Sequence, residues 1–127
     1  MMTGDGLRAL VLDDDEAIRG LIVKVLSAHR FETRFAADGL EGLIQLEVFQ
    51  PDIIICDWMM PNLDGLAFLK AIKQIAATTS IPVIILSAKT DVPSVAESMR
   101  AGACHYLAKP FKRDELLARV KEALTPT

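Results

Sequence analysis

Short apolar runs alternate with amphipathic segments along the whole chain, and this alternation is the feature that most restricts its fold. The runs have the length of buried strands, and the segments between them space apolar residues three and four positions apart, as helices do. Five such pairs follow one another within 127 residues. Strands that are apolar on both faces are typical of a parallel sheet covered by helices on both sides.

The pattern therefore predicts a doubly wound α/β fold with five strands and five helices. The strands are expected at residues 8–12, 32–36, 53–56, 82–86 and 105–108. The helices are indicated by apolar residues at helical spacing, which we expect to face the core, within residues 18–26, 40–48, 66–75, 92–99 and 116–124. The second strand is more polar than the others, so it is expected at an edge of the sheet.

Length and composition fit a single domain over residues 1–127, with a core over about 8–124 and an N-terminal tail at 1–6. No apolar stretch approaches the roughly 18 residues of a membrane span, and the N-terminus does not resemble a signal peptide. Cys56 and Cys104 lack metal-type spacing and fit reduced structural thiols, which indicates a cytoplasmic protein. The net charge of −3 without a basic run argues against nucleic-acid binding by this domain.

Two of the predicted strands end in acidic residues. Asp13 and Asp14 follow the first strand, and Asp57 follows the third. Ligands of open parallel sheets bind at the carboxyl ends of the strands, so we expect these side chains to share one pocket. Carboxylates about 4 Å apart repel by roughly 4 kcal/mol at an effective dielectric near 20. Such a cluster needs a cation or a shared proton.

These strand ends resemble the receiver domain of two-component response regulators, and the chemotaxis-type single-domain regulators in particular. Four motifs carry the resemblance: Asp13-Asp14, the segment DWMMPNLDG at 57–65, Ser87-Ala88 and Lys109-Pro110-Phe111. Each motif is weak alone, but the four in order, each at a predicted strand end, are specific. The resemblance covers about residues 8–124 and implies a flavodoxin-like strand order, 2-1-3-4-5.

The resemblance implies that Asp57 accepts a phosphoryl group from a sensor histidine kinase or a His-containing phosphotransfer domain. Mg²⁺, with Mn²⁺ as an alternative, would be bound directly by Asp14, Asp57 and the backbone carbonyl of Met59, and by Asp13 through a water. The remaining contacts to the phosphoryl group would come from the side chains of Lys109 and Ser87 and the backbone of Trp58 and Ala88. The family also has a cis bond between Lys109 and Pro110.

A switch is implied by the same resemblance. Ser87 would move toward the phosphoryl group, and the ring of Tyr106 would rotate into the space that opens. This movement would change a surface of the fourth helix, fifth strand and fifth helix, where a downstream protein binds. The chain is expected to be a monomer or weak dimer and to catalyse no reaction except its own phosphorylation and slow dephosphorylation. Met59 and Lys89 lie where the family tunes the lifetime of the phosphoryl group.

Two rival functions fit parts of the sequence. An aspartate-nucleophile phosphatase of the haloacid dehalogenase type would use Asp13 as nucleophile and Asp15 as acid. That family expects Thr or Val where Ala17 stands. A receiver that binds proteins independently of phosphorylation is disfavoured by the complete set of acidic, hydroxyl and lysine residues. The chain also fits either a stand-alone protein or a fragment of a larger regulator.

Overall fold

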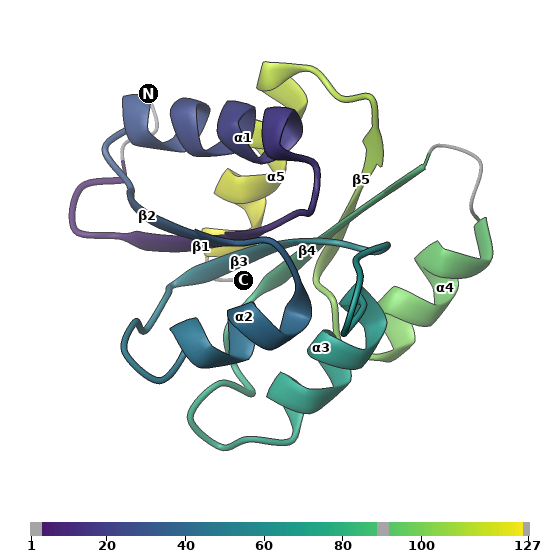
Figure 1. Cartoon of the computed structure of the whole chain (residues 1–127). Coiled ribbons are helices and arrows are strands. Elements are labelled where there is room, and N and C mark those ends of the chain that lie inside the picture. Colours follow the sequence, from purple (N-terminus) through teal and green to yellow (C-terminus); the bar gives the residue numbers. More distant parts are fainter. Residues whose placement is uncertain (1–3, 89–91, 126–127) are drawn as a thin grey trace.

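All ten predicted elements are present in the computed structural model, which describes residues 4–88 and 92–125 (Figure 1). The strands are β1 (Arg8–Leu12), β2 (Glu32–Ala36), β3 (Ile53–Asp57), β4 (Val83–Ala88) and β5 (His105–Lys109). The helices are α1 (Glu16–Ala28), α2 (Gly39–Gln45), α3 (Gly65–Lys73), α4 (Val92–Arg100) and α5 (Arg113–Leu124). Among these helices, none is both long enough and apolar enough to cross a membrane.

The strands form one parallel sheet in the order β2-β1-β3-β4-β5, which confirms the predicted fold, strand order and edge position of β2. The order reverses between β1 and β3, which lie side by side although the chain leaves them in opposite directions. Their register pairs Leu12 with Cys56. The residues that come next in each strand therefore meet at the carboxyl edge of the sheet, where open sheets of this kind bind ligands.

Helices cover both faces of the sheet. Figure 1 shows α1 and α5 on one face and α2, α3 and α4 on the other. Successive residues of a strand point to opposite faces, so Val11 and Ile55 pack in the core beneath α1 and α5, whereas Leu10 and Ile54 pack beneath α2 and α3. Both faces of the central strands are therefore buried, which explains their unbroken apolar runs.

Three strands differ from their predicted bounds at the carboxyl end. β3 includes Asp57, β4 begins one residue later than expected and continues through Ala88, and β5 includes Lys109. The extensions arise from pairing between strands: Asp57 pairs with Leu86, and Ala88 pairs with Lys109. Polar residues that the sequence placed after the strands are therefore held by the hydrogen bonds of the sheet itself.

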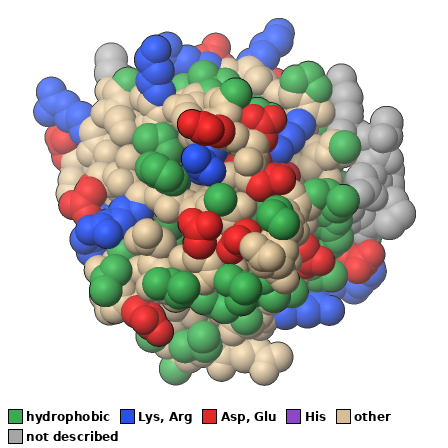
Figure 2. Space-filling model, viewed as in Figure 1, with side chains coloured by type: hydrophobic (Ala, Val, Ile, Leu, Met, Phe, Trp, Pro, Cys, Tyr) green, Lys and Arg blue, Asp and Glu red, His purple; other side chains and the backbone are tan. Residues whose placement is uncertain are grey.

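The prediction that the apolar helix positions all face the core was wrong for one group of residues. The exposed side chains, which are 45–71% accessible, are Leu21, Leu40, Ile44, Val48, Ile75 and Met99. Val48 and Ile75 lie beyond the ends of α2 and α3. Leu40 and Ile44 lie one helical turn apart on the outer side of α2. The side that faces the core carries Gly42, which is packed against Leu12 and Phe68. Figure 2 shows a row of hydrophobic side chains over α2.

Two isoleucines provide a direct test of this distribution of burial. Ile54 is fully buried in the central strand, whereas Ile44 is 64% exposed on α2. Ile54→Ala should lower the free energy of unfolding by about 2–5 kcal/mol, because it removes buried methyl groups and leaves a cavity. Ile44→Ala should change it by less than about 0.5 kcal/mol. Urea denaturation of both variants measures the difference, and equal losses would contradict the assigned core.

Candidate functional site

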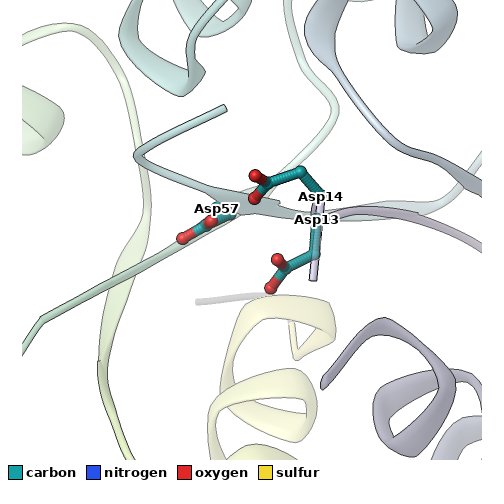
Figure 3. Close-up of side chains that lie close together, drawn as sticks. All are labelled: Asp13, Asp14 and Asp57. Carbon is teal, nitrogen blue, oxygen red and sulfur yellow. The ribbon is translucent and has the colours of Figure 1, made fainter. Parts of the chain in front are cut away.

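Three carboxylates meet at the carboxyl edge of the sheet. Asp13 and Asp14 follow β1, and Asp57 ends β3. One oxygen from each side chain lies within 4.8 Å of the others, and Figure 3 shows the three groups side by side. Asp13 and Asp57 are buried, whereas Asp14 is exposed. This acidic cluster has the oxygen ligands and the partial exposure that a hard divalent cation requires.

Lys109 supplies positive charge to the cluster from the end of β5. Its Nζ lies 2.9 Å from Asp13 Oδ2 and 3.1 Å from Asp57 Oδ1. The pKa of Lys109 is raised although burial acts to lower it, because the carboxylates of Asp13 and Asp57 stabilise its ammonium form. The bond from Lys109 to Pro110 is cis, as the resemblance implied. One ammonium group therefore faces two buried carboxylates.

That single positive charge does not compensate for the whole cluster. Burial and the neighbouring Asp13 raise the pKa of Asp57 from 3.8 to about 6, while Lys109 acts to lower it. The Asp57 carboxylate is consequently ionised at neutral pH but is less stable than it would be in water. In the part of the chain described, the partner of the buried Asp13 Oδ2 is the Lys109 ammonium. The raised pKa of Asp57 fits a site whose charge is completed by a bound cation.

The segment after Asp57 is held by main-chain hydrogen bonds. The Trp58 amide donates to Leu86 O of β4 at 2.8 Å, and the Gly65 amide donates back to Trp58 O at 3.0 Å. Gly65 lies so close to Asp57 that a Cβ there would collide with the Asp57 carbonyl oxygen. Between these bonds, Met59 is 70% exposed. The segment thus crosses the edge of the acidic cluster in a defined conformation.

Ser87 lies on β4, the strand that pairs with β3, and Tyr106 lies on β5, the next strand. Ser87 is buried in β4, and its hydroxyl belongs to the strand adjacent to Asp57. The Tyr106 hydroxyl donates to the carbonyl oxygen of Ala88 at 3.0 Å, so the two strand ends are directly connected. Lys89, the other residue expected to tune the site, lies outside the described residues.

A third buried carboxylate, Asp38, follows β2 and was missed from the sequence. Asp38 caps α2 by accepting the Glu41 amide at 2.8 Å, and it accepts the side-chain amide of Asn62 at 2.6 Å. An acidic residue three positions before Glu41 is a recognisable helix-start pattern. Its contact with Asn62, 24 positions later in the chain, could not be predicted from the sequence around either residue.

Asp15 bears on the phosphatase alternative, which requires this residue as an acid. Its side chain instead accepts the amides of Ala17 and Ile18 and caps α1. These two hydrogen bonds hold the carboxylate at the start of α1. The local geometry therefore gives Asp15 a structural role.

Comparison with known proteins identifies one family. The model of the response regulator receiver domain matches residues 9–121 of the chain. Response regulator MprA of Mycobacterium avium is 38% identical over 122 residues, which are 95% of this chain and 52% of that protein. DNA-binding response regulator MtrA of Mycobacterium tuberculosis is 34% identical over 117 residues, or 92% of this chain and 50% of that protein.

One similar solved structure is matched by this chain over its full length. The chemotaxis response regulator CheY4 of Vibrio cholerae superposes with a TM-score of 0.87 at 30% identity, over 98% of this chain and 100% of that one. By contrast, the chain spans about half the length of the curated relatives it matches. The likeness to those longer relatives is therefore a likeness to one part of each.

The raised pKa of Asp57 predicts an effect of pH on stability. A carboxyl group that binds its proton more tightly in the folded state makes folding less favourable as the pH rises from about 4 to about 6. Asp57→Asn should therefore raise the free energy of unfolding in EDTA near neutral pH, by on the order of 1–3 kcal/mol. The gain should shrink toward zero near pH 4, where both folded and unfolded Asp57 become protonated.

Asp64→Asn is the matched control, because Asp64 caps α3 outside the cluster and Asn caps helices equally well. Urea denaturation at several pH values gives the comparison. A variant Asp57→Asn that is less stable than the wild type near neutral pH would show that Lys109 overcompensates the cluster.

Proposed function

Because the chain belongs to the response regulator receiver domain family, we propose that it is a phosphorylation-controlled switch in which Asp57 accepts the phosphoryl group. The main support for this proposal is that three groups required for phosphoryl transfer lie together. A buried carboxylate, a cluster of cation ligands and a lysine ammonium lie within contact distance of one another. Phosphoryl transfer depends chiefly on positioning and charge neutralisation, and this constellation provides both.

The transfer step uses the ionised form of Asp57. One of its oxygens attacks the phosphorus atom of a phosphohistidine, the bond between phosphorus and the imidazole nitrogen breaks, and the imidazole leaves with the electron pair of that bond. The pKa of Asp57, raised to about 6, still leaves the carboxylate ionised at neutral pH. The product is an acyl phosphate on Asp57, and the histidine side chain is released neutral after taking or keeping one proton.

Mg²⁺ is the cofactor proposed for this step, with Mn²⁺ as an alternative. Asp14, Asp57 and the Met59 carbonyl would hold it directly, and Asp13 would bind through a water. When bound, the ion supplies positive charge to the phosphoryl oxygens. The residues present fit an ion of this kind, because three carboxylate oxygens converge within 4.8 Å and one of the three side chains is exposed to solvent. Hard oxygen ligands with open positions for water suit Mg²⁺.

Lys109 and Ser87 are assigned to the phosphoryl group itself. The ammonium of Lys109 already lies 3.1 Å from an oxygen of Asp57 and would neutralise a phosphoryl oxygen attached there. Ser87 would donate its hydroxyl hydrogen bond, and the backbone of Trp58 and Ala88 would complete the contacts. Ser87 and Ala88 both belong to β4, the strand that pairs with the Asp57 end of β3.

Signalling would follow from the movement of β4 toward the added phosphoryl group. Tyr106 is hydrogen-bonded to the Ala88 carbonyl, so a shift of Ser87 and Ala88 would release its hydroxyl. The ring of Tyr106 would then rotate inward and change the surface formed by α4, β5 and α5. We assign this surface to a downstream protein partner, and the phosphoryl donor to a histidine kinase or phosphotransfer domain.

The proposed activity is limited to this chain's own phosphorylation and slow hydrolysis. The proposed partners of the domain do not include nucleic acid, although the relative MtrA is named as DNA-binding; the match covers half of that protein. We propose that the domain acts as a monomer or weak dimer.

Radiolabelled acetyl phosphate with Mg²⁺ tests the central assignment. The wild type should acquire acid-stable, base-labile label, because an acyl phosphate hydrolyses readily in base. Asp57→Asn should acquire none, and EDTA should suppress labelling of the wild type. Asp64→Asn, which changes a carboxylate in the same segment but leaves its helix cap intact, should label as the wild type does. Label on both the wild type and Asp57→Asn would assign the acceptor to another residue.

Met59 gives a prediction about the lifetime of the phosphoryl group. Its side chain is 70% exposed at the edge of the acidic cluster and cannot orient a water by hydrogen bonding. Met59→Asn should speed hydrolysis severalfold, because an amide could direct a water toward phosphorus. The measurement is the loss of label from the purified phosphoprotein after acetyl phosphate is removed. Met59→Leu is the control that stays apolar, and equal rates in all three proteins would refute the role of Met59.

A further inference from the structure

The segment between Asp57 and Gly65 is fastened to α2 as well as to the sheet. Asn62 Nδ2 donates to Asp38 Oδ2 at 2.6 Å, and the Gly39 amide donates to Leu63 O at 3.0 Å. We refer to these two hydrogen bonds as the α2 latch. They join the first turn of α2 to the outer end of the segment that carries Met59.

The Asp38 side of the latch is a well-stabilised carboxylate. Asp38 is 6% exposed, and its two oxygens accept from different partners, the Glu41 amide and Asn62. Both hydrogen bonds lower the pKa of Asp38, the Glu41 amide having the larger effect and Asn62 the next. The group is thus a charged acceptor at neutral pH, and hydrogen bonds to charged acceptors are stronger than those between neutral groups.

The backbone on both sides of the latch is adapted to this close contact. Asn62 has a φ of +68°, a conformation that Asn tolerates better than most residues. At Gly39 a Cβ would lie 2.6 Å from the carbonyl oxygen of Leu63. Neither feature is required by the acidic cluster directly, since neither residue supplies one of its carboxylates.

The segment that carries Met59 is anchored at both ends. The inner end of the segment is anchored at Trp58, whose amide bonds to β4 and whose carbonyl accepts from Gly65. The latch anchors the outer end at Asn62 and Leu63. Met59 lies between the two anchors, so the direction of its backbone carbonyl depends on both.

We propose that Asn62 and Asp38 are positioning residues for the cation: their hydrogen bond holds the Met59 carbonyl in the orientation that completes the acidic cluster. This inference rests on the proposed function, in which Met59 O is a direct ligand. Residues that orient the ligands of a metal typically change its affinity by about 10-fold or more when they are altered. The latch also makes α2 part of the site, so that a displacement of this helix would change cation affinity.

Two variants isolate the side-chain contact. Asn62→Gly removes the amide but tolerates the positive φ, so the backbone is not strained. Asp38→Ser keeps a helix cap for α2 but is too short to serve Asn62. Each should weaken Mg²⁺ binding about 10-fold, measured by calorimetry or by Trp58 fluorescence. The double variant should be no weaker than either single variant, because both remove the same hydrogen bond.

Thr78→Val is the matched control for a purely structural effect. The Thr78 hydroxyl donates to Ile72 O at 2.6 Å, at the end of the sheet opposite the acidic cluster. Its loss should lower the urea midpoint and leave Mg²⁺ affinity unchanged. If Asn62→Gly and Thr78→Val lose stability alike and neither changes Mg²⁺ affinity, the latch is structural only and the inference is refuted.

The wild-type measurements separate this inference from the proposed function. If the wild type bound no Mg²⁺ and took no label on Asp57, the proposed function itself would fail. If the wild type did both and Asn62→Gly matched it in Mg²⁺ affinity, only the positioning role would be lost. Weaker binding in Asn62→Gly and Asp38→Ser without additivity in the double variant supports the latch.

Discussion

The repulsion between Asp13 and Asp57 is the interaction on which the rest of the site depends. The sheet leaves these carboxylates no room to separate, because β1 and β3 are neighbours in a register that pairs Leu12 with Cys56. The carboxyl ends of both strands are buried, so the charges cannot move into water without breaking the core. Burial, which has the larger effect, and Asp13 both raise the pKa of Asp57, to about 6. The fold thus forces an unfavourable arrangement that a cation or a bound proton relieves.

Part of that relief is supplied from a distant part of the sequence. Lys109 reaches the cluster from β5, which is separated from β3 by β4, so the ion pair exists only when the sheet has assembled in the order observed. Nearby carboxylates are satisfied differently: Asp15, Asp38 and Asp64 each accept backbone amides at the start of a helix. Helix caps of this kind need no counter-ion. Asp13 also accepts a backbone amide, that of Asp15, so the feature that distinguishes the acidic cluster is the Lys109 ammonium shared by Asp13 and Asp57.

Local pattern predicted the elements of this fold well because its central strands are buried on both faces, and the acidic strand ends followed from the same reasoning. The predicted positions of the strand ends were less accurate, because Asp57 and Lys109 are polar and join their strands only through pairing with β4. The exposure of Ile44 was missed because helical spacing identifies an apolar stripe without showing what covers it. The contact between Asp38 and Asn62 has no signal in either segment, because only the packing of α2 against the segment after β3 brings them together.

A site that is unfavourable until it is filled has a consequence for the whole domain. Any ligand that binds the folded state alone stabilises it by mass action, and the cation proposed for this site would neutralise the charge that destabilises the fold. Replacing Asp57 by a neutral residue would remove the conflict and, with it, the group proposed to take the phosphoryl. The carboxylate at the end of β3 therefore lowers the stability of the fold while providing the proposed phosphoryl acceptor. The apolar core around Ile54 and Ile55 allows the chain to tolerate that opposition, because its burial supplies stability that does not depend on the charge state of the cluster.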